Sequence, residues 1–407
     1  MGEFTPPAFF PMQHDEYDII IMGAGPAGLT AAARAGANGA RVLVLDKAKT
    51  AGTKLLIAGG GKGNLTNRSI TVADYVGQHP SFARHTLERL PPPAVIRAFE
   101  QAGVTLEERE HGQIFCATSA RDVLTKLVRD LPKTCRIACG MTVDAIQPPD
   151  ANGVFLVQAK GNSFASPKLV AATGTPAWPQ CGADDSGLRL MHALGHRIIP
   201  LRPVLTPFVL PPSSPLTGLA GISVPVRIYI DGSDSPAFTQ PLLFTHKGIS
   251  GPAALQISCF WRKGQSLVID FLPENSVATL LDTARGKASA RSLIVRLLPE
   301  RLCNALLPEH LALRRAAELS RKDRQHIAGC FHAHSLQPLR TEGLQRAEAA
   351  AGGVDTDEVN PETLESRRIP GLFFCGEMLD IAGRLGGYNL HWAWASGTVA
   401  GECASRR

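Results

Sequence analysis

The chain has 407 residues, enough for two or three domains at about 150 residues per domain. Its hydrophobic content of 44% and charged content of 19% are ordinary for a globular protein, and no stretch of about 20 residues is continuously apolar, so we expect no membrane span. The net charge is +6, and nine scattered cysteines without a C-x-x-C pair argue against a bound metal and favour a reducing, cytoplasmic location.

Residues 17–46 predict a dinucleotide-binding unit, after a proline-broken stretch, 1–16, that we expect to be a loose leader. Two short apolar runs, 17–22 and 41–45, are typical of buried parallel strands. Between them lies G-x-G-x-x-G. Its glycines permit a tight turn, a close approach of the backbone to a pyrophosphate, and close packing of the following helix on the sheet. An acid follows where ribose hydroxyls need an acceptor. The expected cofactor-binding residues are Gly23, Ala24, Gly25, Pro26, Ala27, Gly28, Asp46 and Lys47.

A glycine-rich stretch at 59–67 follows, where three successive glycines precede Lys62, Gly63 and N-L-T-N. So much glycine predicts an irregular loop whose N–H groups meet something anionic or flat, with lysines as charge partners. A flexible connector is the alternative interpretation. The candidates from this region are Lys54, Gly60, Gly61, Asn64 and Thr66.

Helical periodicity over 83–103 and 121–131, with the prolines at 91–93 introducing the second helix of the region, precedes three predicted strands at 141–146, 153–159 and 168–172. The last strand runs into A-T-G, where a doubly wound sheet would bring another backbone turn towards the cofactor. We add Val143, Thr173 and Gly174 to the binding candidates.

The character of the chain changes at about residue 200. Prolines become frequent, and alternating runs at 224–230 and 267–271 predict a small antiparallel barrel over 200–272, with a polar turn around His246. Residues 273–331 are helical in short pieces, and 332–343 returns to the barrel as a strand.

Ten basic residues lie between Arg285 and Arg324 in this helical segment. Such a stretch can touch a polyanion, but no aromatic residues are interleaved to stack on bases. The spacing is more typical of solvated helix faces, so we do not expect a nucleic-acid partner.

After about residue 344 the chain returns to α/β character. A predicted strand at 369–375 opens onto Gly376 and Glu377, and a second glycine turn precedes a helix at 391–401. Because this repeats the first unit, we expect the acid near polyol hydroxyls and the turn amides at an electron-rich ring edge; an ordinary helix cap is the alternative. The candidates are Gly376, Glu377, Gly386, Gly387, Tyr388, Asn389 and Leu390.

These motifs together resemble a known family, the BaiN-like (YhiN-like) FAD-dependent flavoproteins, which includes aminoacetone-oxidase-type enzymes. The resemblance rests on GAGPAG at 23–28, GGGKGNLTN at 59–67, ATG at 172–174, FTHKGISGP at 244–252, AGGV at 351–354 and the long block at 371–397. It implies an α/β fold in which a split Rossmann-like FAD-binding domain, 17–199 and 344–407, is interrupted by a β-barrel and a small helical subdomain. It also implies FAD as the cofactor, with the C-terminal glycine block near the isoalloxazine.

Two departures from the family pattern stand out. The family usually has arginine and cysteine in the glycine loop, whereas this chain has Lys62 and Gly63, so any role of that thiol is absent. The usual T-G-D-G after A-T-G is replaced by D-D-S-G at 184–187, so we expect a substrate different from that of the better-known members of the family.

Three functions remain open at this point. The first is an NAD(P)H-dependent reductase of a small organic acceptor such as an activated alkene, with NAD(P)H docking transiently because only one nucleotide-binding unit is present. The second is an amine oxidase that uses oxygen, and the third is a flavin-bearing nucleic-acid-binding or regulatory protein. As catalytic acid or base we favour His246, with His391 and Tyr388 as further candidates. The sequence leaves the oligomeric state open.

Overall fold

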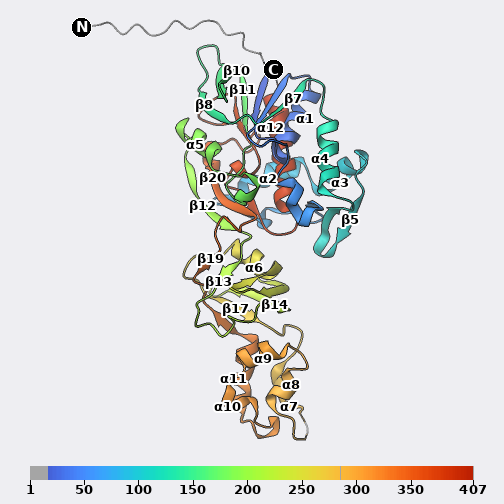
Figure 1. Ribbon diagram of the computed structural model, residues 1–407, viewed down its shortest axis with the longest axis vertical. Coiled ribbons are helices and arrows are strands. Elements are labelled where there is room, and N and C mark those ends of the chain that lie inside the picture. Colours follow the sequence, from blue (N-terminus) through green and yellow to red (C-terminus); the bar gives the residue numbers. More distant parts are fainter. Residues whose placement is uncertain (1–16, 285, 407) are drawn as a thin grey trace, which may run out of the picture.

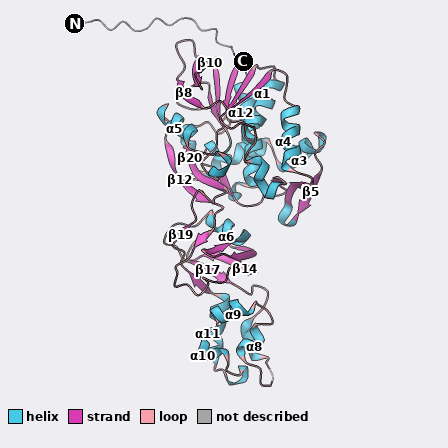
Figure 2. Ribbon diagram, viewed as in Figure 1, coloured by secondary structure: helices cyan, strands magenta, loops and turns pink. Residues whose placement is uncertain are grey.

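The computed structural model describes residues 17–284 and 286–406, and its three parts lie along one axis (Figure 1). An α/β part occupies one end, a mainly antiparallel sheet lies in the middle, and short helices form the other end, as Figure 2 shows by secondary structure. The expected leader and Arg285 lie outside the described residues. Within the described ranges, no helix is both long enough and apolar enough to cross a bilayer.

A five-stranded parallel sheet forms the centre of the α/β part, in the order β21, β11, β1, β2, β7. The bounds are β1 Ile19–Met22, β2 Val42–Asp46, β7 Cys135–Cys139, β11 Lys168–Ala171 and β21 Leu372–Phe374. An antiparallel sheet of β8 Val143–Gln147, β9 Phe155–Ala159 and β10 Asn162–Ser166 contributes to the same core. Because β21 comes from the C-terminal segment and pairs with β11, both ends of the chain build one domain, and the expected α/β class is confirmed.

The helices α1 Pro26–Ala37 and α12 Tyr388–Ala404 lie against each other in this core. A Cβ atom at Gly397 would lie 2.4 Å from the carbonyl oxygen of Ala27, and one at Gly401 would lie 2.4 Å from that of Ala31. Only glycine permits so close an approach. The glycines of α12 therefore set its distance from the helix that follows the first glycine motif.

A smaller sheet beside α12 contains β3 Asn64–Asn67, β5 Leu106–Arg109 and β6 Gln113–Cys116. The same part of the chain contains the helices α2 Ala83–Arg89, α3 Pro92–Gln101 and α4 Ala120–Arg129. Residues 64–67 were expected to form an irregular loop, and that expectation was wrong. The partner strand β6 is distant in sequence and supplies the hydrogen bonds that make 64–67 a strand.

Two antiparallel strands, β12 Ile198–Val204 and β20 Ala349–Val354, connect the α/β part to the middle sheet. That sheet has seven strands in the order β18, β17, β14, β15, β16, β13, β19. The bounds are β13 Phe208–Val209, β14 Ser223–Ile230, β15 Phe238–Phe244, β16 Gly248–Ser250, β17 Leu267–Asp270, β18 His334–Leu336 and β19 Arg340–Thr341, and α6 Gly251–Ser258 packs on it.

The far end consists of α7 Val277–Asp282, α8 Ala290–Ile294, α9 Glu300–Leu306, α10 Glu309–Ala312 and α11 Arg321–His332. One hydrophobic core runs from the middle sheet into these helices, with Phe271 and Phe331 both buried in it. The helical end therefore packs directly onto the sheet and shares its hydrophobic core.

Candidate functional site

The three glycines of the first motif have different surroundings. A Cβ atom at Gly23, where φ is +103°, would lie 2.5 Å from the carbonyl oxygen of Ala172, and one at Gly28 would lie 1.9 Å from that of Gly23. At Gly25 no atom lies within 4 Å of such a Cβ. Protein thus fills the space at two glycines and leaves it open at the third, beside the N-terminus of α1, where an anionic ligand is favoured.

A pocket lies at the carboxyl ends of β1, β2 and β11. Asp46 stands on its wall, where Oδ2 accepts a hydrogen bond from the Ala24 N–H at 2.6 Å and Oδ1 accepts one from the Ala48 N–H at 2.7 Å. The lining residues are Met22, Gly23, Leu45, Asp46, Lys47, Met141, Thr142, Val143, Thr173, Ser186, Gly187 and Leu190. Five candidates, at positions 23, 46, 47, 143 and 173, thus meet where open α/β sheets bind nucleotides.

The charge of Lys47 is engaged by the protein. Its Nζ lies 2.6 Å from Oδ2 of Asp184. Burial alone would raise the pKa of Asp184, but hydrogen bonds from Lys47 and Ser186 lower it. Asp184 belongs to the segment that departs from the family pattern, so this departure places an ion pair beside the pocket.

The ion pair between Lys54 and Glu377 joins the two halves of the domain. Lys54 Nζ lies 2.9 and 2.8 Å from the two carboxylate oxygens of Glu377. Thr175 Oγ1 donates to the same carboxylate at 3.1 Å, and a Cβ atom at Gly174 would lie 3.8 Å from it. Three segments, one of them 323 residues from another in sequence, therefore converge on one acid.

The second glycine turn opens α12 and is braced by its own side chains. The Asn389 side chain accepts a hydrogen bond from the Gly383 N–H and donates one to the Gly383 carbonyl, both at 2.8 Å. Tyr388 is buried, with its hydroxyl 3.2 Å from an Arg384 nitrogen. Leu390 packs in the apolar cluster around Trp394. These side chains are committed to the fold, so what the turn offers a ligand is backbone N–H groups.

Asn64 supplies a buried acceptor beside this turn. Its Nδ2 donates to Gln113 at 2.8 Å, whereas its Oδ1 is buried and has no hydrogen-bond partner within the described ranges. A Cβ atom at Gly387 would lie 2.8 Å from that oxygen. An unsatisfied buried acceptor costs about 1–3 kcal/mol, which a ring N–H of a bound group would relieve. Open space at Gly25 and Gly60 and this lone acceptor fit a long dinucleotide cofactor.

The family described as "HI0933-like protein Rossmann domain" matches residues 17–403. The chain belongs to the HI0933-like family. Its members are FAD-dependent oxidoreductases, so the resemblance drawn from the motifs and the expectation of a flavoenzyme are confirmed. FAD is the group that the open glycines and the lone Asn64 acceptor suit.

Relatives of this HI0933-like protein align along nearly the whole chain. It is 36% identical to the ribosomal RNA dihydrouridine synthase of Escherichia coli K12, over 94% of this chain and 96% of that protein. It is 32% identical to the 3-dehydro-bile acid delta(4,6)-reductase of Clostridium scindens, over 96% of this chain and 99% of that protein. A solved structure of the E. coli quinol fumarate reductase FrdA shares the fold with a TM-score of 0.51 and 18% identity, covering 97% of this chain and 70% of that one.

The two histidine candidates lie in different parts of the molecule. His391 is fully buried in α12, where its Nδ1 lies 2.8 Å from Thr66 Oγ1 and desolvation lowers its pKa to about 4. His246 is exposed on the turn between β15 and β16. His391 is therefore a neutral group inside the protein, and it lines no described pocket.

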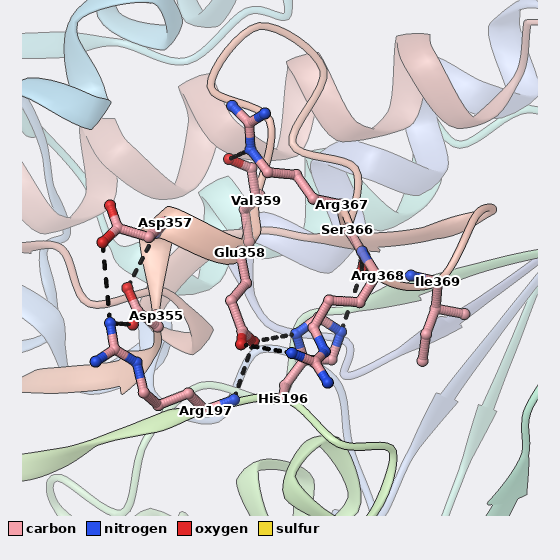
Figure 3. Close-up of polar contacts among 10 residues, drawn as sticks. All are labelled: His196, Arg197, Asp355, Asp357, Glu358, Val359, Ser366, Arg367, Arg368 and Ile369. Atoms are coloured by element: carbon pink, nitrogen blue, oxygen red, sulfur yellow. Dashed lines mark hydrogen bonds and ion pairs between the residues drawn. The ribbon is translucent and has the colours of Figure 1, made fainter.

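A polar cluster braces the C-terminal half of the domain (Figure 3). His196, fully buried, lies 3.0 Å from Glu358 Oε2 and 3.1 Å from Ser366 Oγ, the atom order of a Ser-His-Glu triad. Ser366 Oγ is itself buried and also accepts hydrogen bonds from the N–H groups of Arg368 and Ile369 at 3.0 and 2.9 Å. Its lone pairs are used, so the cluster holds β12 against the segment before β21.

Several site residues were missed by the sequence analysis. Thr175, on the carboxylate of Glu377, follows the A-T-G motif by one residue and has no signal of its own. Ser186 and Gly187, which the sequence singled out only as part of D-D-S-G and not as pocket residues, open α5 Ser186–Ala193 and line the pocket. A Cβ atom at Gly187 would lie 1.9 Å from Thr173 Oγ1, so the small pair at this helix start was the available signal.

Proposed function

We propose that this chain reduces the C5–C6 double bond of a uracil base in structured RNA, using bound FAD and NAD(P)H as the source of electrons. The observation that carries the proposal is the likeness, over 94% of the chain, to a ribosomal RNA dihydrouridine synthase. Dihydrouridine is uridine with that double bond saturated. The second relative is, by its name, also a reductase of carbon–carbon double bonds, which supports the activated-alkene interpretation of the sequence.

FAD, when bound, supplies a hydride to the substrate. Gly25 and the N-terminus of α1 would hold its pyrophosphate, Asp46 its ribose, and Asn64 with the Gly387 turn its ring. A conjugated double bond that accepts hydride at one carbon must accept a proton at the other. The chain therefore needs a proton donor beside the substrate.

The helical end supplies a surface for RNA. Four of its basic side chains pair with acids: Arg291 with Glu300, Arg314 with Asp323, Arg315 with Glu318 and Arg324 with Asp282. Arg321 and Lys322, in the first turn of α11, are exposed and form no ion pair within the described ranges. Together with the exposed Gln325 and His326 one turn later, they define the α11 face.

The distance between the α11 face and the cofactor site favours a long partner. The helical end and the α/β part lie at opposite ends of the molecule, with the seven-stranded sheet between them (Figure 1). A partner that contacts both ends must extend along the protein, which a folded RNA does and a small molecule does not. A uracil in such an RNA must leave its stack to enter the site. This proposal departs from the sequence-based expectation of a small-molecule substrate.

Two anaerobic half-reactions test the function. NADH or NADPH should bleach the absorbance of the FAD-loaded protein, and a uridine-containing RNA hairpin should then restore it and gain two hydrogens by mass spectrometry. Free uridine and a small α,β-unsaturated ketone serve as comparison acceptors. An amine that bleaches the protein while neither nucleotide does so would support the amine oxidase instead. A cytoplasmic location belongs to the proposal, and it agrees with nine free thiols.

A further inference from the structure

We propose that Glu348 is the acid that gives its proton to one substrate carbon as the neighbouring carbon accepts hydride. The proposal rests on the reductase function proposed above and names the donor that this function requires. Glu348 stands alone in an alanine-rich stretch, 347–351, that the sequence analysis passed over.

Glu348 immediately precedes β20, one of the two strands that connect the α/β part to the middle sheet (Figure 1). Its N–H donates to the carbonyl of Leu205 at 3.2 Å. Ala349 and Ala351, which follow it, belong to a small apolar cluster that includes Leu205 and Cys259. The acid is therefore fixed at the edge of an apolar junction between two parts of the chain.

The segment before Glu348 runs along the stretch that follows the A-T-G turn. The Trp178 N–H donates to the carbonyl of Leu344 at 3.2 Å, and the Gln180 side chain donates to the carbonyl of Gln345 at 3.0 Å. The same stretch contains Thr175, which contacts Glu377 in the cofactor half. The residues just before Glu348 are thus hydrogen-bonded to the stretch that leads from the A-T-G turn to residues 184–187, where the chain departs from the family pattern.

No hydrogen bond or ion pair engages the Glu348 carboxyl within the described ranges. Lys54 is the cation that faces it. However, Lys54 already contacts both carboxylate oxygens of Glu377, at 2.9 and 2.8 Å. Desolvation raises the pKa of the Glu348 carboxyl and outweighs the attraction of Lys54, which lowers it.

The surroundings of Glu348 combine exposure with desolvation. The side chain is open to solvent, yet desolvation by the surrounding protein raises the pKa of its carboxyl. The titratable groups that face it are Lys54 and Cys259, and the Cys259 thiol is fully buried with a pKa raised to about 12, so it carries no charge at neutral pH. A ligand can reach this acid while bulk water screens it poorly.

Other donors are less well placed. The thiol that the family carries in the glycine loop is replaced by Gly63 in this chain. His391 is fully buried, so a substrate does not reach it in this structure. Cys181 is half-buried near Lys54, and burial raises the pKa of its thiol, which makes it the competing donor.

The atoms and electrons of the step balance. Hydride from the reduced cofactor forms a C–H bond at one carbon, and the electron pair of the double bond moves to the other carbon. That carbon takes the proton from the Glu348 O–H, which leaves a carboxylate and oxidised cofactor. Solvent then reprotonates the carboxylate, and NAD(P)H supplies the two electrons of the next turnover.

Three variants of the FAD-loaded protein test the proposal: Glu348→Gln, Cys181→Ser, and Glu362→Gln as an exposed control acid. We expect Glu348→Gln to keep its melting temperature, its FAD and its rate of reduction by NAD(P)H. Its reoxidation by the alkene should fall about 10²- to 10⁴-fold, the usual contribution of a general acid. The reoxidation rate of the wild-type protein should fall as pH rises through the raised pKa of Glu348, and that of Glu348→Gln should not respond.

An infrared titration of the resting protein gives a readout that does not depend on turnover. The wild type should show a protonated carboxyl that persists above the ordinary glutamic-acid range and is missing in Glu348→Gln. A carboxyl at Glu348 that titrates in the ordinary range, or an unchanged reoxidation rate in Glu348→Gln, would overturn the proposal while leaving the reductase function intact. Loss of reoxidation in Cys181→Ser alone would assign the proton to the thiol. If no alkene reoxidises the wild type, the reductase function itself fails and the Glu348 proposal fails with it.

Discussion

At the scale of single residues, Gly25 differs from the other two glycines of its motif because no atom lies within 4 Å of a Cβ placed on it. Its backbone is extended, with φ −78° and ψ −178°, so a β-branched residue is compatible with the fold there. We expect Gly25→Val to fold with nearly the wild-type melting temperature and to be purified colourless, because the side chain occupies the pyrophosphate position.

Gly28→Val is the matched comparison, since its Cβ atom would meet the Gly23 carbonyl and the fold itself should suffer. The ratio of flavin to protein absorbance and the melting temperature separate the two effects. A Gly25→Val protein that keeps full flavin would refute this placement of the cofactor.

Residues of the site were predictable where local geometry demands a particular amino acid. The motif glycines were found because tight turns and close approaches exclude side chains, as the Cβ distances at Gly23 and Gly28 show. Lys54 and Glu377 are 323 residues apart in sequence, and only the tertiary fold brings them into contact. Both residues were therefore predicted as site residues, but their pairing was not. Glu348 is an ordinary residue whose surroundings alone make it special, and no local pattern reports surroundings.

At the scale of elements, the spacing between α1 and α12 rests on glycine. Gly401→Ala should destabilise the protein by about 1–3 kcal/mol, because even a methyl group would meet the Ala31 carbonyl. Gly329→Ala in α11 makes the same change where no atom lies within 4 Å, and there alanine should be neutral or stabilising by up to about 1 kcal/mol. Chemical denaturation of both variants measures the contrast. Equal changes in the free energy of unfolding would show that α12 can shift away from α1 to accommodate the methyl group.

The same scale explains which elements the sequence predicted. The helical end, 273–331, was expected correctly because helical periodicity is local. Strand β3 was missed because its hydrogen bonds come from β6, and glycine content near residue 60 suggested a loop. Strand β7 was not predicted either; it is a short edge strand in a chain rich in other apolar runs, and only its pairing with β2 defines it.

At the scale of the whole molecule, the helical end gives a test of RNA as the partner. The α11 face belongs to a unit packed through one core onto the middle sheet, so charge reversal there should leave the cofactor site unchanged. We expect Arg321→Glu with Lys322→Glu to weaken binding of an RNA hairpin and to reduce the slope of log affinity against log salt by about 2, one for each lost phosphate contact. The control Arg121→Glu with Lys133→Glu changes the net charge equally at exposed positions of the α/β part. Reduction of a small unsaturated ketone should be the same in all three proteins, because that substrate does not reach α11. Equal weakening by both pairs would mean that RNA responds to net charge alone, and it would remove the helical end from the proposed interface.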